Sequence, residues 1–152
     1  MIYYRNDTRG GGVDGRALVA TAKRLLGAVG EEGSSLSLSL VSDAAIRELN
    51  RDHRGKDKPT DVLSFSQIEN GGVAGGERLL GDVVISIETA RRQAAEYDAP
   101  LQRELYRLLI HGLLHLLGHD HIKAAERRVM EAEERRLAQT IGLTWPYDAA
   151  PG

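Results

Sequence analysis

Cysteine is absent from this chain of 152 residues. Without thiols the chain forms no disulfide and no thiolate metal site, which excludes a small disulfide-linked scaffold and a cysteine zinc finger. Hydrophobic runs are short, and none approaches the roughly 18–20 residues of a membrane-spanning helix. The first residues, Met1 to Arg5, also lack the apolar stretch of a secretory signal. We therefore expect a cytoplasmic protein without membrane association.

Neither sign of charge dominates, and aromatic residues are scarce. The chain has 20 Lys and Arg against 22 Asp and Glu, a formal net charge of −2. This balance argues against a protein that coats nucleic acid through bulk charge, but it permits a local basic groove. A composition that is 41% hydrophobic and 28% charged is typical of a globular protein. We expect one domain over residues 1–143 and a loose C-terminal tail over 144–152.

The periodicity of apolar residues predicts strands and helices in mixed order. Strand patterns, the second of them an alternation of Ser and Leu, lie at 2–4, 34–41, 62–66 and 80–86. Helical patterns, two of them following capping residues at Asp14 and at Ser42 or Asp43, lie at about 15–29, 45–49, 87–97, 101–117 and 124–138. We expect an α+β single domain in which a small mixed sheet of about four strands packs with about five helices.

Four of the five histidines lie within residues 111–121, which read His-Gly-Leu-Leu-His-Leu-Leu-Gly-His-Asp-His. On a helix His111 and His115 are one turn apart on the same face. The other residues of this helix are mainly Leu, Ile and Gly, so we expect it to be buried. Two imidazoles on one face can point at one ion, and imidazole is a common metal ligand at neutral pH. The pair therefore predicts a metal site rather than two separate core histidines.

A third histidine can reach the same ion only if the helix ends. On a continuous helix His111 and His119 are about 12 Å apart along the axis, whereas metal–nitrogen bonds are about 2.1 Å long. The chain must turn after His115, and Gly118 is the natural position because glycine readily ends helices. Beyond that turn the geometry leaves both His119 and His121 open as the third ligand.

The spacing H-x-x-x-H-x-x-G-x-x-H resembles the zinc site of metzincin proteases, whose third ligand follows the glycine by three residues. This resemblance selects His121. One position differs, because those proteases have a general-base Glu directly after the first His and this chain has Gly112. A peptidase of that mechanism would lack its base.

A second motif, R-G-K-D-K-P-T-D-V-L-S-F, occupies residues 54–65. Together with L-G-D-V-V-I-S at 80–86 and the histidine segment, it resembles the YbeY family of bacterial ribosomal-RNA maturation endoribonucleases. The resemblance extends roughly from Leu36 to Met130. It implies an α+β fold with a metalloprotease-like zinc helix and glycine turn. It also implies a single-strand-specific, metal-dependent endoribonuclease that acts in ribosomal RNA maturation and ribosome quality control.

The resemblance also implies roles for individual residues. The implied metal ligands are His111, His115 and His121, and the implied catalytic arginine is Arg54, which we expect on a loop that enters the strand at 62–65. Two positions depart from the family pattern without touching these residues. They are His119, where an aromatic such as Tyr is usual, and Ser66, where Pro is usual.

Three histidines without cysteine favour one Zn²⁺ per chain with an open position for water, and Ni²⁺ or Co²⁺ would also suit imidazole. Such an ion lowers the pKa of bound water from about 15.7 toward about 7. Since position 112 is glycine, any general base must come from elsewhere. Asp120 is one candidate, although a carboxylate there more readily fixes a ligand or the turn. Glu104, two turns before His111, is a weaker candidate for a residue that supports a metal-ligating histidine. The alternative is that it is a solvated residue.

The charged segment 51–58 has two interpretations. Runs of charge are usually solvated turns, but Arg and Lys can also bind phosphates. The resemblance favours the second interpretation for Arg54. We therefore expect single-stranded RNA, ribosomal RNA in particular, as substrate, and a ribosomal-protein partner that brings this weakly charged protein to the ribosome. The alternatives are a non-catalytic zinc-containing ribosome-associated factor and, with less support, a metalloprotease with a displaced base.

Overall fold

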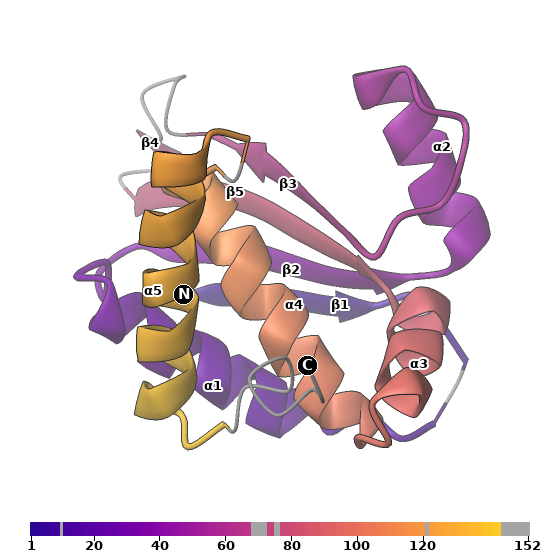
Figure 1. The fold of residues 1–152 in the computed structure, drawn as a ribbon, viewed down its shortest axis with the longest axis horizontal. Coiled ribbons are helices and arrows are strands. Elements are labelled where there is room, and N and C mark those ends of the chain that lie inside the picture. Colours follow the sequence, from indigo (N-terminus) through magenta and orange to yellow (C-terminus); the bar gives the residue numbers. More distant parts are fainter. Residues whose placement is uncertain (10, 68–72, 75–76, 121, 144–152) are drawn as a thin grey trace.

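A mixed β-sheet forms the centre of the fold (Figure 1). The computed structural model describes residues 1–9, 11–67, 73–74, 77–120 and 122–143. The strands are β1 (Ile2–Asn6), β2 (Ser35–Val41), β3 (Val62–Ser66), β4 (Val73–Ala74) and β5 (Glu77–Ser86). They are arranged in the order β1-β2-β5-β3, with β4 paired to β5 beside this path. The pairs β1–β2 and β2–β5 are parallel, whereas β3 runs antiparallel to β5. The four predicted strands are confirmed, and β4 is an addition.

Five helices accompany the sheet in the described ranges, which confirms the α+β prediction. They are α1 (Gly15–Ala28), α2 (Asp43–Arg54), α3 (Ile87–Glu96), α4 (Leu101–Leu116) and α5 (Ala124–Thr140). As predicted, the Asp14 carboxylate accepts a hydrogen bond from the first turn of α1. Of the two candidate caps for α2, Ser42 accepts the hydrogen bond. Such caps satisfy backbone N–H groups that have no partner within the helix.

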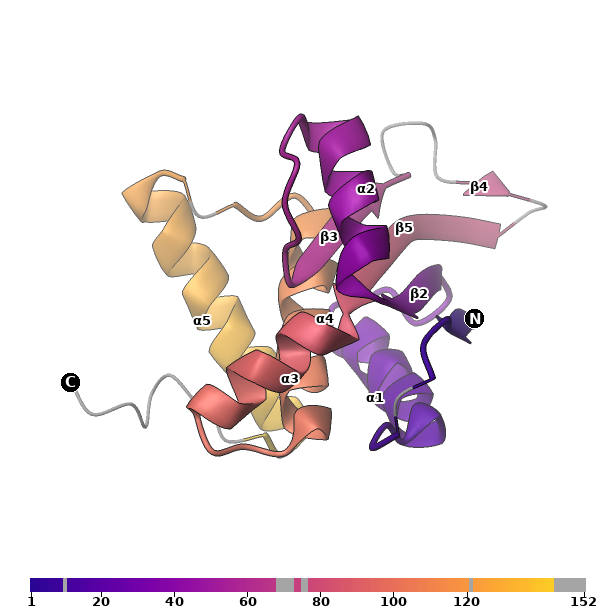
Figure 2. The same ribbon diagram turned by 90° about the vertical axis from the view of Figure 1, so that its right-hand side faces the viewer.

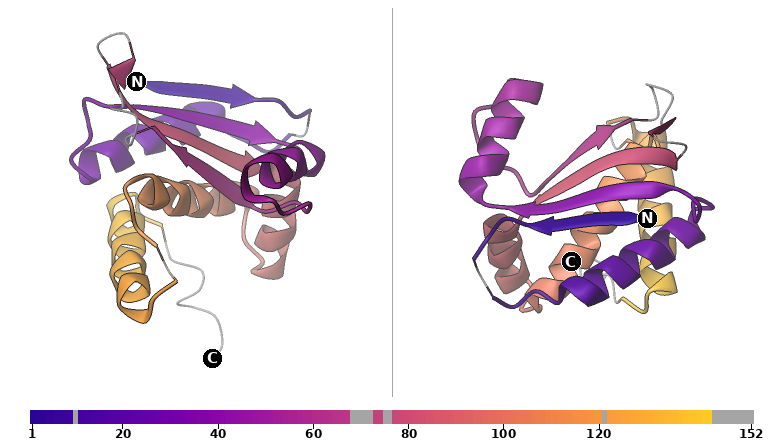
Figure 3. Two further views of the ribbon diagram at one scale, coloured as in Figure 1. Left: turned by 90° about the horizontal axis from the view of Figure 1, so that it is seen from above. Right: turned by 180° about the vertical axis from the view of Figure 1, so that it is seen from behind.

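Helices cover the two faces of the sheet unequally. Helices α1, α4 and α5 pack on one face in the main hydrophobic core, to which β5 contributes Val83 and Ile85. Helix α2 packs on the other face, where Val84 joins Val41, Ile46 and Leu63 in a smaller cluster. Figure 2 shows α2 apart from the other helices, and the left view of Figure 3 shows α4 and α5 together on one side of the sheet. The strand β3 therefore has α4 on one face and α2 on the other.

Three sequence-based expectations concern the extent of the helices and of the described chain. The charged segment expected to start a loop at Arg51 is instead helical through Arg54, because α2 ends only at Gly55, whose φ is +70°. The expected tail, 144–152, lies outside the described residues. No helix in the described part of the chain is long and apolar enough to span a membrane.

Candidate active site

Two histidines of α4 point toward each other, as the sequence predicts. The Nε2 atoms of His111 and His115 are 3.1 Å apart. Two imidazole nitrogens that bind one tetrahedral ion at about 2.1 Å are separated by about 3.4 Å. At the observed distance, the N–H of one ring can donate a hydrogen bond to the other ring. Two rings whose lone pairs point at one ion would need nearly the same separation and orientation. The pair therefore fits a divalent metal ion without rearrangement of α4.

Glu134 of α5 orients the first of these rings. Its Oε2 lies 3.2 Å from His111 Nδ1, and its side chain is only 11% exposed. A carboxylate there accepts a hydrogen bond from Nδ1–H, so the Nε2 lone pair of His111 faces His115. Sequence reasoning did not identify Glu134. Its position was a usable signal, because it lies among Met130, Leu137 and Ala138 on the buried face of α5.

Glu104 has a different role from either one expected. The residue is buried, and both its carboxylate oxygens accept hydrogen bonds from the Arg107 guanidinium, at 2.5 and 2.8 Å. Arg107 also donates to the side chain of Gln93 at 3.3 Å and lies 4.0 Å from the Asp61 carboxylate. Asp61 in turn accepts from the backbone N–H of Val62 at 2.8 Å. Glu104 is thus neither solvated nor a partner of a metal ligand. Its ion pair lies within α4 and holds Arg107 beside Asp61, the residue that directly precedes β3.

Helix α4 ends at the predicted glycine. Gly118 has a φ of +93°, and the N–H groups of Gly118 and His119 donate to the carbonyls of His115 and Leu114 at 3.1 and 3.0 Å. This is the double hydrogen bond of a Schellman turn. His121, the expected third ligand, lies outside the described residues, and within them no group of three His, Asp or Glu side chains could hold an ion. The assignment of His121 stays a prediction.

His119 lies near α5. The pKa of the Glu133 carboxyl is lowered mainly by a hydrogen bond from Arg136 and in small part by the charge of His119. Among the described residues that line the cleft beside the histidine pair, His119 does not occur. The choice of His121 over His119 as the third ligand stays a prediction.

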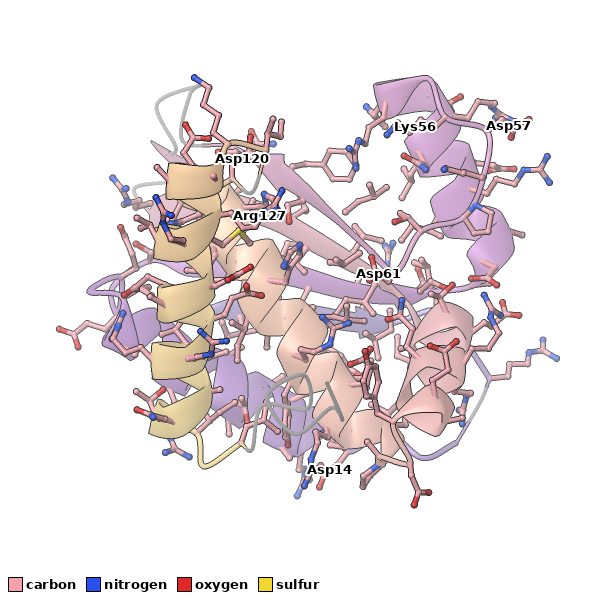
Figure 4. The ribbon with its side chains drawn as sticks, viewed as in Figure 1. Asp14, Lys56, Asp57, Asp61, Asp120 and Arg127 are labelled. Atoms are coloured by element: carbon pink, nitrogen blue, oxygen red, sulfur yellow. The ribbon has the colours of Figure 1, made fainter. Side chains whose placement is uncertain are left out.

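A cleft of about 970 Å³ brings three of the predicted functional residues together. His111, His115 and Arg54 all line it, with residues of β3 between them. Figure 4 shows Lys56 on the α2 side of this region and Asp120 on the α4–α5 side, and both line the cleft. The expectation that Arg54 lies on a loop is wrong, because it is the last residue of α2. Arg54 nevertheless lines the same cleft as the two histidines.

The positive charges of the cleft remain available to a ligand. Two nearby acidic residues are occupied, since Asp57 pairs with Arg47 at 2.8 Å and Asp52 pairs with Arg51 at 3.1 Å. None of the ion pairs found in the described ranges includes the three cations of the cleft wall, which are Arg54, Lys56 and Lys58. All three are exposed. This wall can therefore bind an anion such as a phosphate.

Gly112 occupies the position of the protease base, and the packing there admits no side chain. An added Cβ would lie 2.7 Å from Val83 Cγ1 of β5 and 3.2 Å from Ser64 Oγ of β3. The Ser64 hydroxyl also donates to the Gly112 carbonyl at 2.9 Å. A glutamate at this position would push α4 off the sheet, so the protease arrangement is incompatible with this helix packing.

Known proteins match this chain over most of its length. The family model described as Endoribonuclease YbeY matches residues 6–142. The Endoribonuclease YbeY of Moorella thermoacetica is 49% identical over 140 residues, which cover 85% of this chain and 90% of that protein. The Endoribonuclease YbeY of Syntrophotalea carbinolica is 43% identical over 143 residues, which cover 93% and 95%. The solution structure of TM1509 from Thermotoga maritima has the same fold, with a TM-score of 0.57 and 24% identity over 100% of this chain and 99% of that one. From its sequence over nearly its whole length, the chain belongs to the YbeY endoribonuclease family.

Proposed function

We propose that this protein is a metal-dependent endoribonuclease that cuts single-stranded RNA in the cleft between α2 and α4. The observation that carries the proposal is that one cleft contains both the His111–His115 pair and the cation Arg54. Hydrolysis of a phosphodiester requires an activated oxygen nucleophile and positive charge around the phosphate. The names of the relatives support RNA as the substrate.

The chain supplies ligands suited to a zinc ion. His111, His115 and the predicted ligand His121 would hold it, and Ni²⁺ or Co²⁺ would suit the same imidazoles. When bound, such an ion supplies a Lewis acid and lowers the pKa of water at an open coordination position. Glu134 keeps the Nε2 lone pair of His111 directed into the cleft. This arrangement is that of a catalytic metal site rather than a closed structural one.

Arg54 acts on the substrate phosphate. Its guanidinium can donate two parallel hydrogen bonds to a phosphate and counter the charge that develops as the P–O bond breaks. Lys56 and Lys58 extend the positive wall along which neighbouring phosphates can lie. Asp120 also lines the cleft, and its carboxylate is a candidate to serve as a base or to hold the turn after α4.

The cellular role that we propose is maturation of ribosomal RNA and ribosome quality control in the cytoplasm. A net charge of −2 gives weak general attraction to RNA, so delivery by a ribosomal-protein partner suits this chain. A zinc-containing ribosome-associated factor without catalysis would show the same fold. Cleavage by the purified protein separates the two alternatives.

Single-turnover cleavage of a labelled single-stranded fragment of ribosomal RNA tests the proposal. We expect Arg54→Ala to reduce the rate about 100- to 1000-fold, because removal of one transition-state contact costs about 2.7–4 kcal/mol. Arg54→Lys should recover little of this, since an ammonium lacks the planar pair of donors. Arg51→Ala is the matched control, because that arginine is already paired with Asp52. Undiminished cleavage by Arg54→Ala would mean that Arg54 is only a solvated residue at the end of α2.

The same preparations test the metal and the competing functions. We expect one metal ion per chain, lost in His121→Ala and retained in His119→Ala. Retention in the first variant or loss in the second would overturn the ligand assignment. Casein is the parallel substrate. Cleavage of casein but not of RNA would show that the protein is a protease and not a nuclease.

A further inference from the structure

Two rings in the cleft have no part in the chemistry described so far. His53, in the last turn of α2, and Phe65, on β3, have ring centroids 5.0 Å apart and an interplanar angle of 61°. Both residues line the cleft that contains Arg54 and the histidine pair of α4. Aromatic residues make up only 5% of the chain, and Phe65 is its single phenylalanine. A ring pair beside the candidate site is therefore a specific feature of this cleft.

Phe65 belongs only partly to the core. It packs against the small cluster beneath α2, whose members Ile46 and Leu63 are 0% and 3% exposed. Phe65 itself is only half-buried. Burial alone would favour a position in which the whole ring is removed from water. The remaining surface of Phe65 is part of the cleft wall, where a flat ligand can cover it.

His53 continues the inner face of α2 beyond the core. Ile46, Asn50 and His53 follow each other by four and three residues, so they lie along one stripe of the helix. The first two are buried and His53 is exposed. Asn50 also donates to the carbonyl of Lys58 at 2.9 Å, which ties the following loop to this end of α2. The imidazole is thus held at the point where the apolar face of α2 gives way to the basic wall.

Rings beside cations match the chemistry of an unpaired nucleotide. The phosphates of single-stranded RNA follow basic side chains, and its exposed bases stack on aromatic faces, including histidine. Arg54, Lys56 and Lys58 supply the first component, and His53 with Phe65 supplies the second. A base within a duplex is already stacked on its neighbours and cannot be covered in this way.

We propose that His53 and Phe65 form a stacking platform for one unpaired RNA base adjacent to the phosphate bound by Arg54, in which the base stacks on the face of one ring and the other ring, inclined at 61°, borders it. The proposal rests on the proposed nuclease function and adds a reason for preference for single strands. The platform acts in binding, so the loss of a ring weakens the capture of RNA and leaves the maximal rate of cutting largely unchanged.

The test combines ring variants with RNAs that lack one base. Single-turnover cleavage over a range of protein concentrations gives the half-saturating concentration and the maximal rate. We expect His53→Ala and Phe65→Leu to raise the half-saturating concentration about 5- to 100-fold, the size of one base–aromatic stack. His53→Tyr should bind RNA about as tightly as the wild type, because it keeps a ring at this position. Tyr3→Ala, which removes an exposed aromatic of β1 outside the cleft, is the control.

Abasic substrates separate stacking from a merely structural role. An RNA series with one abasic position each should include one position at which the wild type loses affinity and the His53→Ala penalty disappears. At that position 2-aminopurine should lose fluorescence on binding to the wild type and not on binding to the variants. A penalty of equal size on every abasic RNA would overturn the platform, because the rings would then only shape the loop.

Failure of the nuclease proposal gives a different result. If the wild type neither binds nor cuts single-stranded RNA, both proposals are wrong. If the wild type cuts RNA and the ring variants match it in both constants, only the platform is wrong. Thermal unfolding of each variant shows whether Phe65→Leu has disturbed the small cluster, and His53→Ala, at an exposed residue, provides the comparison that does not depend on the core.

Discussion

Replacement of Gly112 by alanine should weaken the contact between α4 and the sheet, although glycine is normally unfavourable within a helix. The added methyl group would meet Val83 Cγ1 at 2.7 Å and Ser64 Oγ at 3.2 Å. Val83 is 0% exposed on β5, and its β-branched side chain has little freedom to rotate away. The helix therefore has to move, and His111 moves with it.

The expected size follows from two opposing effects. Overpacking of a well-packed core costs about 1–3 kcal/mol, whereas Gly→Ala in a helix interior gains about 1 kcal/mol. Because the added methyl group would contact both β5 and β3, the overpacking cost of Gly112→Ala should lie in the upper part of the first range. We expect a net loss of about 1–2 kcal/mol in the free energy of unfolding. For a domain of this size each kcal/mol lowers Tm by about 2–4 °C.

Urea unfolding of four proteins measures this effect and its cause. The set is the wild type, Gly112→Ala, Val83→Ala and the double variant. Removal of the Val83 methyl groups makes room for the new methyl, so the double variant should be more stable than the sum of the single losses predicts, by about 0.5–3 kcal/mol. Gly27→Ala in α1 is the matched control. An added Cβ there meets nothing within 4 Å, and we expect unchanged or increased stability. Wild-type stability of Gly112→Ala, or strict additivity in the cycle, would refute the steric argument.

Two further predictions concern carboxylates. Glu134→Gln should weaken zinc binding about 10- to 100-fold in competition with a chromogenic chelator, because an amide holds the Nδ1–H of His111 less firmly; Glu133→Gln is the control, and equal affinities of the two variants would contradict the orienting role. Burial opposes the charge of Asp43, but hydrogen bonds from Ser86, Thr89 and Arg92 outweigh it and hold the pKa of the carboxyl below its usual value. A lowered folded-state pKa stabilises the fold above the unfolded-state value, about pH 4, and this contribution is lost as the pH falls through the folded-state pKa. Acid unfolding of Asp43→Asn should therefore show a weaker pH dependence there than the wild type, and identical acid profiles would exclude Asp43 as a contributor.

Local chemistry determines the parts of the site that the sequence could predict. Helical periodicity places His111 and His115 on one face whatever surrounds the helix. The turn at Gly118 follows from the freedom of glycine at positive φ, which is observed at +93°. Arg54 was assigned to the wrong element, because a charged run suggests a loop. The start of the charged run is instead the last turn of α2, which ends at Gly55. The Arg47–Asp57 ion pair joins this helix to the segment that follows it.

Tertiary contacts determine the parts that could not be predicted. Glu134 is 23 residues from His111, and only the way α5 packs against α4 brings the two together. The sequence shows an acidic residue on an apolar stripe but not which side chain it meets. The same holds for Glu104, whose burial becomes tolerable through two hydrogen bonds from Arg107.

The two walls of the cleft are held by different means, and this difference bears on how RNA enters. The histidine wall belongs to α4, which packs closely on the sheet and is hydrogen-bonded to β3 through Ser64. The basic wall belongs to the end of α2 and the loop after it, which are held by the small cluster beneath α2 and by the hydrogen bond from Asn50 to Lys58. Fewer buried contacts make a region easier to displace locally. Adjustment to different RNA sequences should therefore occur by movement of the α2 wall, while the histidine pair keeps its geometry.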